Sequence, residues 1–152
     1  MSTPTSAPIE VGQEIPERVV DVDPARMKTL SALMRDPNPI HFDSESTNAL
    51  GLGDRTVNQG PSNVAYVVSA LGAWVGVHNV VSYRFRYLAN VFAGDRVRAG
   101  GRVDEITDTT EGPIAHCAVW LDVDGGTRAL EGAATVRLPH HTENTDEQRS
   151  DQ

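Results

Sequence analysis

The 152-residue sequence contains a single cysteine, Cys117. One cysteine cannot form a disulfide within the chain, so the sequence favours a reducing compartment, the cytoplasm. Because Cys117 is followed by Ala118 and Val119, we expect a small core residue rather than a reactive thiol. No group of cysteines and histidines has the spacing of a metal site, and the pair His140-His141 lies in a polar segment. No metal is therefore predicted.

Long apolar runs and an excess of positive charge are also missing. No segment has the roughly 20 consecutive apolar residues of a transmembrane helix. Residues 1–8 lack the basic start and the apolar middle of a signal peptide. The formal net charge of −8 argues against nucleic acid or an anionic membrane surface as a partner.

The composition along the chain indicates one domain between two tails. The length suits a single domain with a full core. Residues 1–8 and 140–152 are rich in Ser, Thr, Pro or charged residues without apolar periodicity. We therefore predict a flexible N-terminal tail, a domain over residues 9–139 and a disordered C-terminal tail.

The first half of this domain has mainly helical patterns. After a short strand candidate within residues 9–22, Asp23 supplies an N-cap and Pro24 suits the first helical position, which predicts an amphipathic helix over 24–34. Asp43 can cap a second, short helix over residues 44–50.

The longest apolar segment, residues 61–75, repeats apolar side chains at three-four spacing. There is no charged residue from Gly60 to Gly76. We expect a central helix that is buried nearly all round.

The second half changes to a period of two residues, which is typical of half-buried strands. The glycine pair Gly100-Gly101 suggests a bulge or bend. Consecutive strands joined by short turns imply an antiparallel sheet, and the predicted class is α+β, with this sheet wrapped around the central helix. The predicted strands are residues 80–88, 95–104, 114–123 and 130–138.

Residues 35–43, with the sequence RDPNPIHFD, concentrate two acids, an amide and an imidazole around two prolines. Proline keeps the preceding residue out of the helical region, so Asp36 and Asn38 should have extended or turn geometry. A carboxylate and an imidazole on such a loop can converge on one small molecule. The local pattern alone also fits an Asx/Pro turn that ends a helix, with His41 at the surface.

The pattern formed by Asp36, Asn38, Pro39 and His41 resembles the Gly-Asp-x-Asn-Pro-x-His motif of MaoC-like (R)-specific enoyl-CoA hydratases, which have the hot-dog fold. This family resemblance implies a hydratase or dehydratase that adds water reversibly across the double bond of a 2-enoyl thioester. Asp36 and His41 match the family's catalytic pair, which holds the water for syn addition. The resemblance implies no cofactor beyond the coenzyme A or carrier-protein pantetheine of the substrate.

Two further matches follow in the family's order. Gln59-Gly60 stands where the family has a His-Gly pair that opens the central helix. Residues 84–95 are similar to the family's Phe-x-x-Pro-Val-x-Pro-Gly-Asp strand and turn. Together the matches cover roughly residues 12–138, and their combination is more specific than any single match.

We assign substrate-binding roles to Asn38, Gly60, Gln59 and Ser62, and all of these except Gln59 have a structural alternative. Asn38 can bind the water or brace its own loop. A helix N-terminus at Gly60 can stabilise the enolate-like oxygen, or the glycine can serve only a tight turn. Ser62 can hydrogen-bond Asp36 or cap the helix.

Two residues beside the predicted pair depart from the family pattern. Arg35 replaces the glycine before the acid, and Gln59 replaces the histidine before Gly60. Because the acid and the imidazole are both present, we expect the departures to bear on pocket shape and substrate range.

The arginines and aromatics of the second half have two interpretations. The arginines can bind phosphates of coenzyme A or pantetheine, or they form salt bridges on a solvated sheet face. These are Arg84, Arg86, Arg96 and Arg98. Four aromatics are expected in the core or at a dimer contact: Trp74, Trp120, Tyr66 and Phe85.

Hot-dog proteins usually pair their sheets edge to edge, so the resemblance implies a homodimer or higher oligomer. Two other functions stay open. One is a non-catalytic, acyl-thioester-binding subunit of a heteromeric dehydratase, which the departures at Arg35 and Gln59 allow. The other is a hot-dog thioesterase, which is less favoured because its usual carboxylate on the central helix has no counterpart from Gly60 to Gly76.

Overall fold

The computed structural model describes residues 8–139, so the tail predictions for residues 1–7 and 140–152 lie outside the described part. No helix within the described range is long and apolar enough to cross a membrane. In chain order the elements, of which η1 and η2 are 3-10 helices, are β1 (Glu14–Asp21), α1 (Pro24–Met34), η1 (Pro39–His41), α2 (Ser44–Ala49), α3 (Gly60–Val75), η2 (Val77–Asn79), β2 (Val80–Tyr87), β3 (Arg96–Thr109), β4 (Gly112–Val123) and β5 (Thr127–Arg137).

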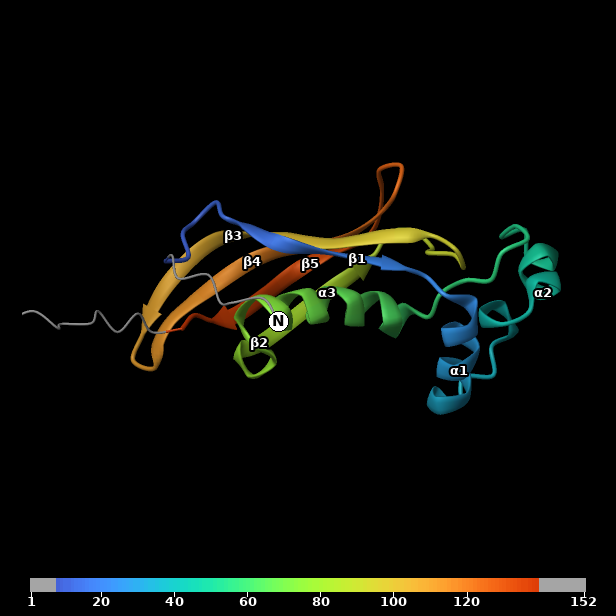
Figure 1. Ribbon diagram of the computed structural model, residues 1–152, viewed down its shortest axis with the longest axis horizontal. Helices are drawn as coiled ribbons and strands as arrows, with labels where there is room; N and C mark the ends of the chain where they lie inside the picture. Colours follow the sequence, from blue (N-terminus) through green and yellow to red (C-terminus); the bar gives the residue numbers. More distant parts are fainter. Residues whose placement is uncertain (1–7, 140–152) are drawn as a thin grey trace, which may run out of the picture.

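All five strands belong to one antiparallel sheet with the order β1-β3-β4-β5-β2 (Figure 1). β3, β4 and β5 form a meander, as their short turns predict. β2 does not pair with β3, which follows it in sequence, but lies at the opposite edge against β5. β1 and β2 are therefore the two edge strands.

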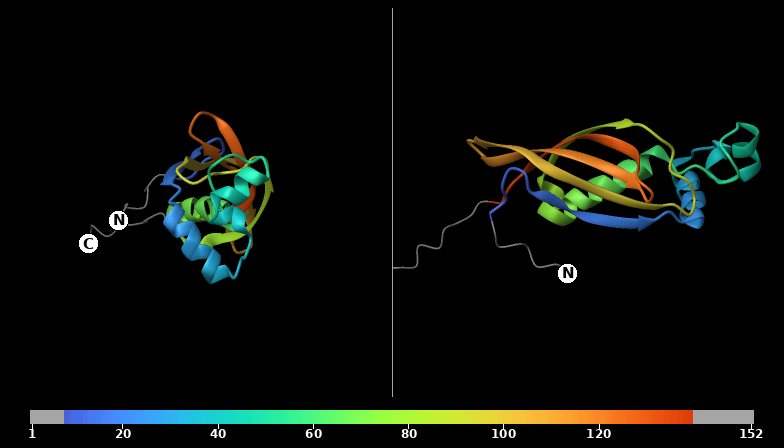
Figure 2. Two further views of the ribbon diagram at one scale, coloured as in Figure 1. Left: turned by 90° about the vertical axis from the view of Figure 1, so that its right-hand side faces the viewer. Right: turned by 90° about the horizontal axis from the view of Figure 1, so that it is seen from above.

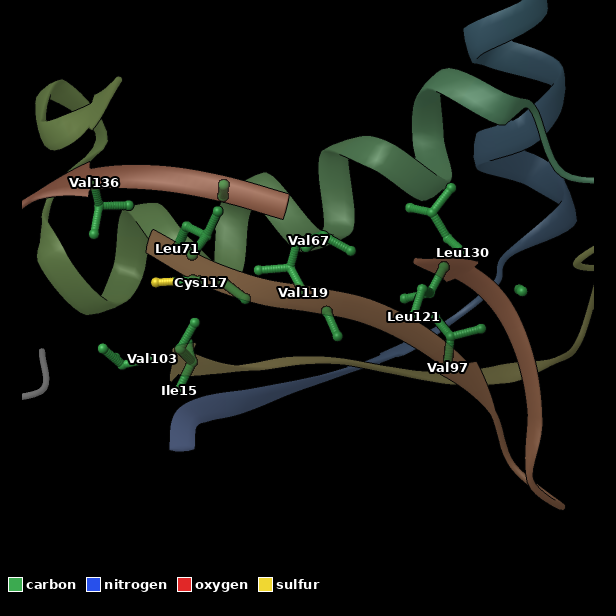
Figure 3. Close-up of a cluster of buried hydrophobic side chains, with 14 of the residues drawn as sticks. Ile15, Val67, Leu71, Val97, Val103, Cys117, Val119, Leu121, Leu130 and Val136 are labelled. Atoms are coloured by element: carbon green, nitrogen blue, oxygen red, sulfur yellow. The ribbon is translucent and has the colours of Figure 1, made fainter. Parts of the chain in front are cut away.

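The sheet curves around α3, which lies along its inner face (Figures 1 and 2). Val67 and Leu71 of the helix point toward Val119 and Cys117 of β4, and all four side chains belong to one buried apolar cluster (Figure 3). Burial, together with the charge of Asp104, raises the pKa of the Cys117 thiol to about 11. The α+β prediction and the prediction of a core cysteine are both confirmed.

α3 is less enclosed than its sequence suggests. Residues on the side away from the sheet, including Ala65, Ser69 and Ala73, are exposed. The prediction of burial nearly all round is thus wrong for the single chain, because its sheet covers only one side of the helix. The result is a charge-free helix face that no element of the described chain covers.

α1, η1 and α2 lie beyond one end of the sheet, beside the N-terminal end of α3 (Figure 1). Asp23 caps α1 as predicted, since its carboxylate accepts a hydrogen bond of 2.8 Å from the N–H of Ala25. The apolar face predicted for this helix is only partly buried: Met27 is in the core, whereas the Leu33 side chain is 76% exposed. α2 begins at its predicted cap, Asp43.

The sheet irregularity near Gly100-Gly101 is in the partner strand. Ile15 pairs with Gly101 and Arg18 with Ala99, so two residues of β1 face Gly100 alone. The register between β3 and β4 is continuous at the glycines and shifts later, between Val103 and Glu105. The predicted bulge thus lies opposite the pair, in β1.

Three of the four aromatics predicted for the core pack against it partly buried: Tyr66, Trp74 and Phe85. Trp120 differs, because it lies on the outer face of the sheet with the Arg128 guanidinium 4.8 Å from its ring centroid. Trp120 is therefore not a core residue, and its alternative, a dimer contact, stays a prediction.

Gly132 offers a test of how closely β2 and β5 approach. A Cβ at this position would lie 2.9 Å from Cδ1 of Phe85 and closer still to the carbonyl oxygen of Arg84. We predict that Gly132→Ala lowers the free energy of unfolding by about 3 kcal/mol, because backbone cannot move aside as a side chain can. The control is Gly100→Ala, whose Cβ would meet the Trp120 side chain at 3.1 Å and should cost less. Equal denaturation midpoints for the two variants would contradict the prediction.

Candidate active site

His41 is held in one orientation by a backbone carbonyl. It lies at the end of η1, is 8% exposed, and its Nδ1 is 2.7 Å from the carbonyl oxygen of Val57. A carbonyl oxygen can only accept a hydrogen bond, so Nδ1 carries the proton and donates it. In the neutral ring, Nε2 is then left with a free lone pair.

Asp36 is held by the end of α1. Its N–H donates to the carbonyl oxygen of Ser31 at 2.9 Å, and its Oδ1 accepts a hydrogen bond of 3.1 Å from the N–H of Asn38. The preceding residue, Arg35, has φ 53° and is the one non-glycine residue with a positive φ between residues 8 and 139. A left-handed conformation costs a residue with a side chain about 1 kcal/mol. This cost explains why the Gly-Asp-x-Asn-Pro-x-His motif has glycine at the position of Arg35.

The two side chains converge, as predicted. Asp36 Oδ2 lies 3.4 Å from His41 Nε2. This separation is longer than a strong hydrogen bond, and a water or substrate oxygen can contact both atoms from one side. Asp36 is 31% accessible at its side chain, so the pair can be reached from outside.

The N-terminus of α3 lies next to the segment that orients His41. Its second residue, Pro61, has no N–H, and the N–H groups of Ser62 and Asn63 both donate to Gln59 O. The absence of a side chain at Gly60 lets Tyr87 approach, because a Cβ there would lie 3.2 Å from both Cε1 and Oη of Tyr87. The alternating pattern of residues 80–88 predicted a strand. It did not indicate that Tyr87, the last residue of β2, lies beside the first residue of α3.

The other predicted site residues have structural contacts of their own. Asn38 caps η1, with its Oδ1 accepting a hydrogen bond of 3.3 Å from the N–H of Ile40. No hydrogen bond joins Ser62 to Asp36 in the described part of the chain; Ser62 lines a cavity instead. Their roles in substrate binding stay predictions.

Gln59 is the most buried of these residues. Its side chain has no exposed surface, and its Nε2 donates to Met27 O at 2.9 Å and to Ser31 Oγ at 2.8 Å. Its Oε1 is buried without a hydrogen-bond partner among the described residues. A buried acceptor left unpaired costs about 1–3 kcal/mol. Gln59 thus connects the start of α3 to α1, and its predicted contact with substrate stays untested.

Two cavities adjoin α1 on different sides. One, of about 410 Å³, lies between α1 and α3, and its lining combines apolar residues with the polar or charged side chains of Asp21, Asp23, Arg26, Thr29, Asn58, Ser62 and Tyr66. The other is an open hollow of about 620 Å³ that includes Asp36 and Phe42 in its lining. Asp36 lines the second and not the first, so its carboxylate is accessible from the second. Within residues 8–139 no His, Cys, Asp and Glu side chains gather in a cluster that could hold a metal ion.

The arginines of β2 and β3 lie on the outer face of the sheet, away from α3. Arg86 pairs with Glu131 at 2.5 Å, and Arg96 has Asp21 at 3.8 Å. Arg98 contacts both Asp124 and Glu17, and these acids raise its pKa. For Arg86, Arg96 and Arg98 the contacts favour the interpretation as a solvated, salt-bridged face over phosphate binding.

Comparison with protein families matches residues 6–116, more than half of the chain, to the MaoC like domain. The chain belongs to the MaoC-like domain family. This family membership confirms the resemblance drawn from Asp36, His41 and Gly60. No curated protein matches the MaoC-like chain in sequence.

Similar solved structures confirm the hot-dog fold. An (R)-hydratase from A. caviae involved in PHA biosynthesis has a TM-score of 0.75 and 26% identity, over 86% of this chain and 98% of that one. The R-hydratase PhaJ1 from Pseudomonas aeruginosa has a TM-score of 0.74 and 18% identity, over 87% and 83%. One chain of the ChsH1-ChsH2 complex from Mycobacterium tuberculosis has a TM-score of 0.73 and 19% identity, over 86% of this chain and 98% of that one.

The contact with Val57 predicts the tautomer of His41. At a pH where the ring is neutral, ¹⁵N NMR should show His41 protonated at Nδ1, because the Val57 carbonyl can only accept a hydrogen bond. The His41 ring resonances are assigned by their disappearance in the His41→Gln variant. His116 is the internal comparison, because its Nδ1 has only a hydroxyl, Thr135 Oγ1, at 3.4 Å. A neutral His41 protonated at Nε2 would contradict the prediction.

Proposed function

We propose that the protein is a hydratase/dehydratase that adds water reversibly across the double bond of a 2-enoyl thioester to give a 3-hydroxyacyl thioester. The observation that supports this most directly is the position of His41: its Nδ1 is engaged by Val57, and its Nε2 lies 3.4 Å from Asp36 Oδ2. The similarity to the (R)-hydratase from A. caviae supports the reaction class.

The proposed chemistry uses one proton shared by the pair. As the water oxygen bonds to Cβ, a proton leaves that water, and another proton is delivered to Cα. A pair that holds one proton can accept the first at one group and donate the second from the other. We assign this proton to neither group in the resting pair.

The start of α3 has a second part in the proposal. Negative charge develops on the thioester oxygen as Cβ is attacked. The N-terminal end of a helix stabilises such charge through its dipole and its free N–H groups. Gly60 is the first residue of α3, and its backbone N–H is the donor that we assign to the thioester oxygen. No resident cofactor is needed, because coenzyme A or the pantetheine of a carrier protein arrives with the substrate.

We further propose that the protein acts in the cytoplasm as a homodimer or higher oligomer that pairs through β2. Several large apolar side chains of this edge and its flanks are exposed: Val77, Val81, Tyr83, Tyr87 and Leu88. An edge strand also presents unpaired backbone groups, and a second strand would satisfy them. The uncovered, charge-free face of α3 would gain cover in such a dimer.

A second candidate is a non-catalytic, acyl-thioester-binding subunit of a heteromeric dehydratase. Arg35 and Gln59, which depart from the family pattern beside the pair, favour it. The similar chain in the ChsH1-ChsH2 complex shows that this fold occurs in a complex of two different chains. A hot-dog thioesterase is disfavoured by the lack of a carboxylate between Gly60 and Gly76.

The activity test uses crotonyl-CoA and a longer or branched enoyl-CoA, with the loss of the conjugated thioester absorbance as the signal. We predict turnover by the wild type and a loss of about 10²–10⁴-fold in kcat for Asp36→Asn and for His41→Gln, since each removes half of the acid–base pair. The matched controls are Asp54→Asn and His78→Gln, which change the same residue types away from the pair.

The controls should keep the wild-type rate. Activity that survives both Asp36→Asn and His41→Gln would rule out the acid–base assignment. No turnover by the wild type on either substrate, with tight acyl-CoA binding retained, would select the binding subunit.

The β2 edge makes a prediction about assembly. Tyr83→Lys combined with Val81→Lys should convert the oligomer to a monomer in light-scattering measurements, because two charges would face each other across the paired strands. Leu33→Lys, at a more exposed apolar position on α1, is the control and should leave the oligomer intact. A wild-type monomer at tens of micromolar, or an oligomer in the double variant, would contradict β2 pairing.

A further inference from the structure

The two members of the pair are attached to different parts of the chain. Asp36 is fixed to α1, because its N–H bonds to Ser31 O in the last turns of that helix. His41 is fixed to the segment before α3, because its ring bonds to Val57 O and the Val57 N–H donates to Ile40 O at 2.8 Å. Their separation therefore depends on how α1 lies relative to residues 57–59.

Gln59 joins these two parts directly. It is two residues after Val57 and caps the start of α3, while its Nε2 reaches across to two acceptors of α1. One acceptor is Ser31 Oγ, and Ser31 is the same residue whose carbonyl holds the Asp36 N–H. A continuous set of contacts thus runs from the His41 side of the site, through Gln59 and Ser31, to Asp36.

We propose that Gln59 is a positioning residue whose amide sets the distance between Asp36 and His41. This inference deepens the proposed function and rests on it wherever activity is the readout. Gln59 does not line the hollow that contains Asp36 and has no exposed surface, so its action on the reaction passes through α1.

The unpaired Oε1 supports a role for the amide rather than for its volume. If Gln59 only filled space, methionine or leucine would fill it without a buried acceptor that lacks a partner. The amide is present although its oxygen, Oε1, accepts no hydrogen bond from the described residues. What the side chain supplies is the donor Nε2, which binds two acceptors spaced one turn apart on α1.

The experiment compares Gln59→Met, which keeps the size and removes both hydrogen bonds, with Gln59→His, whose ring N–H can restore one. Asn79→Leu is the matched control, because Asn79 Nδ2 donates to Val75 O at the other end of α3 at 2.7 Å. Each purified full-length variant is measured for kcat, KM and melting temperature, and the crystal structure of Gln59→Met gives the distance between Asp36 Oδ2 and His41 Nε2.

In Gln59→Met we expect the distance to increase from 3.4 Å by about 1 Å, and kcat to fall about 100-fold with KM within about two-fold. Asn79→Leu should lose a similar amount of thermal stability without this fall in kcat. Gln59→His should recover at least about a tenth of the wild-type kcat. If Gln59→Met does not fold, Ser31→Ala removes one of the two acceptors and should lower kcat about 3–10-fold.

An unchanged distance and an unchanged kcat in Gln59→Met would overturn the inference, as would an equal fall of kcat in Asn79→Leu. The distance does not depend on the reaction. If the wild type turns over no enoyl thioester, the proposed function fails, and the crystal structure alone decides whether Gln59 positions the pair. The charged residues Lys28 and Arg35, which line the same hollow as Asp36, are unchanged in every variant.

Discussion

The packing of α3 against the curved sheet is the constraint on which the rest of the molecule depends. Val67 and Leu71 pack into the sheet from one side of a helix that carries no charge. This burial fixes the helix axis and therefore the position of its first residue, Gly60. The strand-like segment before it is fixed in turn, because Val57 bridges to Phe92 in the connection between β2 and β3. The site is built outward from that segment.

Each half of the acid–base pair is located relative to this segment by hydrogen bonds rather than by apolar packing. The Val57 carbonyl sets the ring of His41, and the amide of Gln59 sets the end of α1 from which Asp36 follows. Hydrogen bonds suit this task because they depend on direction as well as distance. α1 itself is largely exposed, so apolar burial alone would hold it loosely.

Much of this arrangement could be predicted from the sequence, because local chemistry encodes it. The cap at Asp23, the charge-free helix, the meander and the motif containing Asp36 and His41 all depend on neighbours a few residues apart. Three features could not be predicted from the sequence: the position of β2, the Val57 contact of His41 and the buried amide of Gln59. They join residues far apart in the chain, and no local pattern records them. The burial of α3 was overestimated because one chain's sheet covers only one side of it.

The two departures from the family pattern both raise the free energy of the folded chain next to the pair. Arg35 takes a left-handed conformation that glycine would adopt without strain, and Gln59 buries an unpaired oxygen. Unfavourable features of this kind persist when the surrounding structure fixes them, and they concentrate where geometry matters more than stability. Arg35 is the C-cap of α1, Gln59 contacts α1 from the start of α3, and both bear on where Asp36 is placed. The local cost at Arg35 and Gln59 is therefore best explained by the precision required at the Asp36 carboxylate.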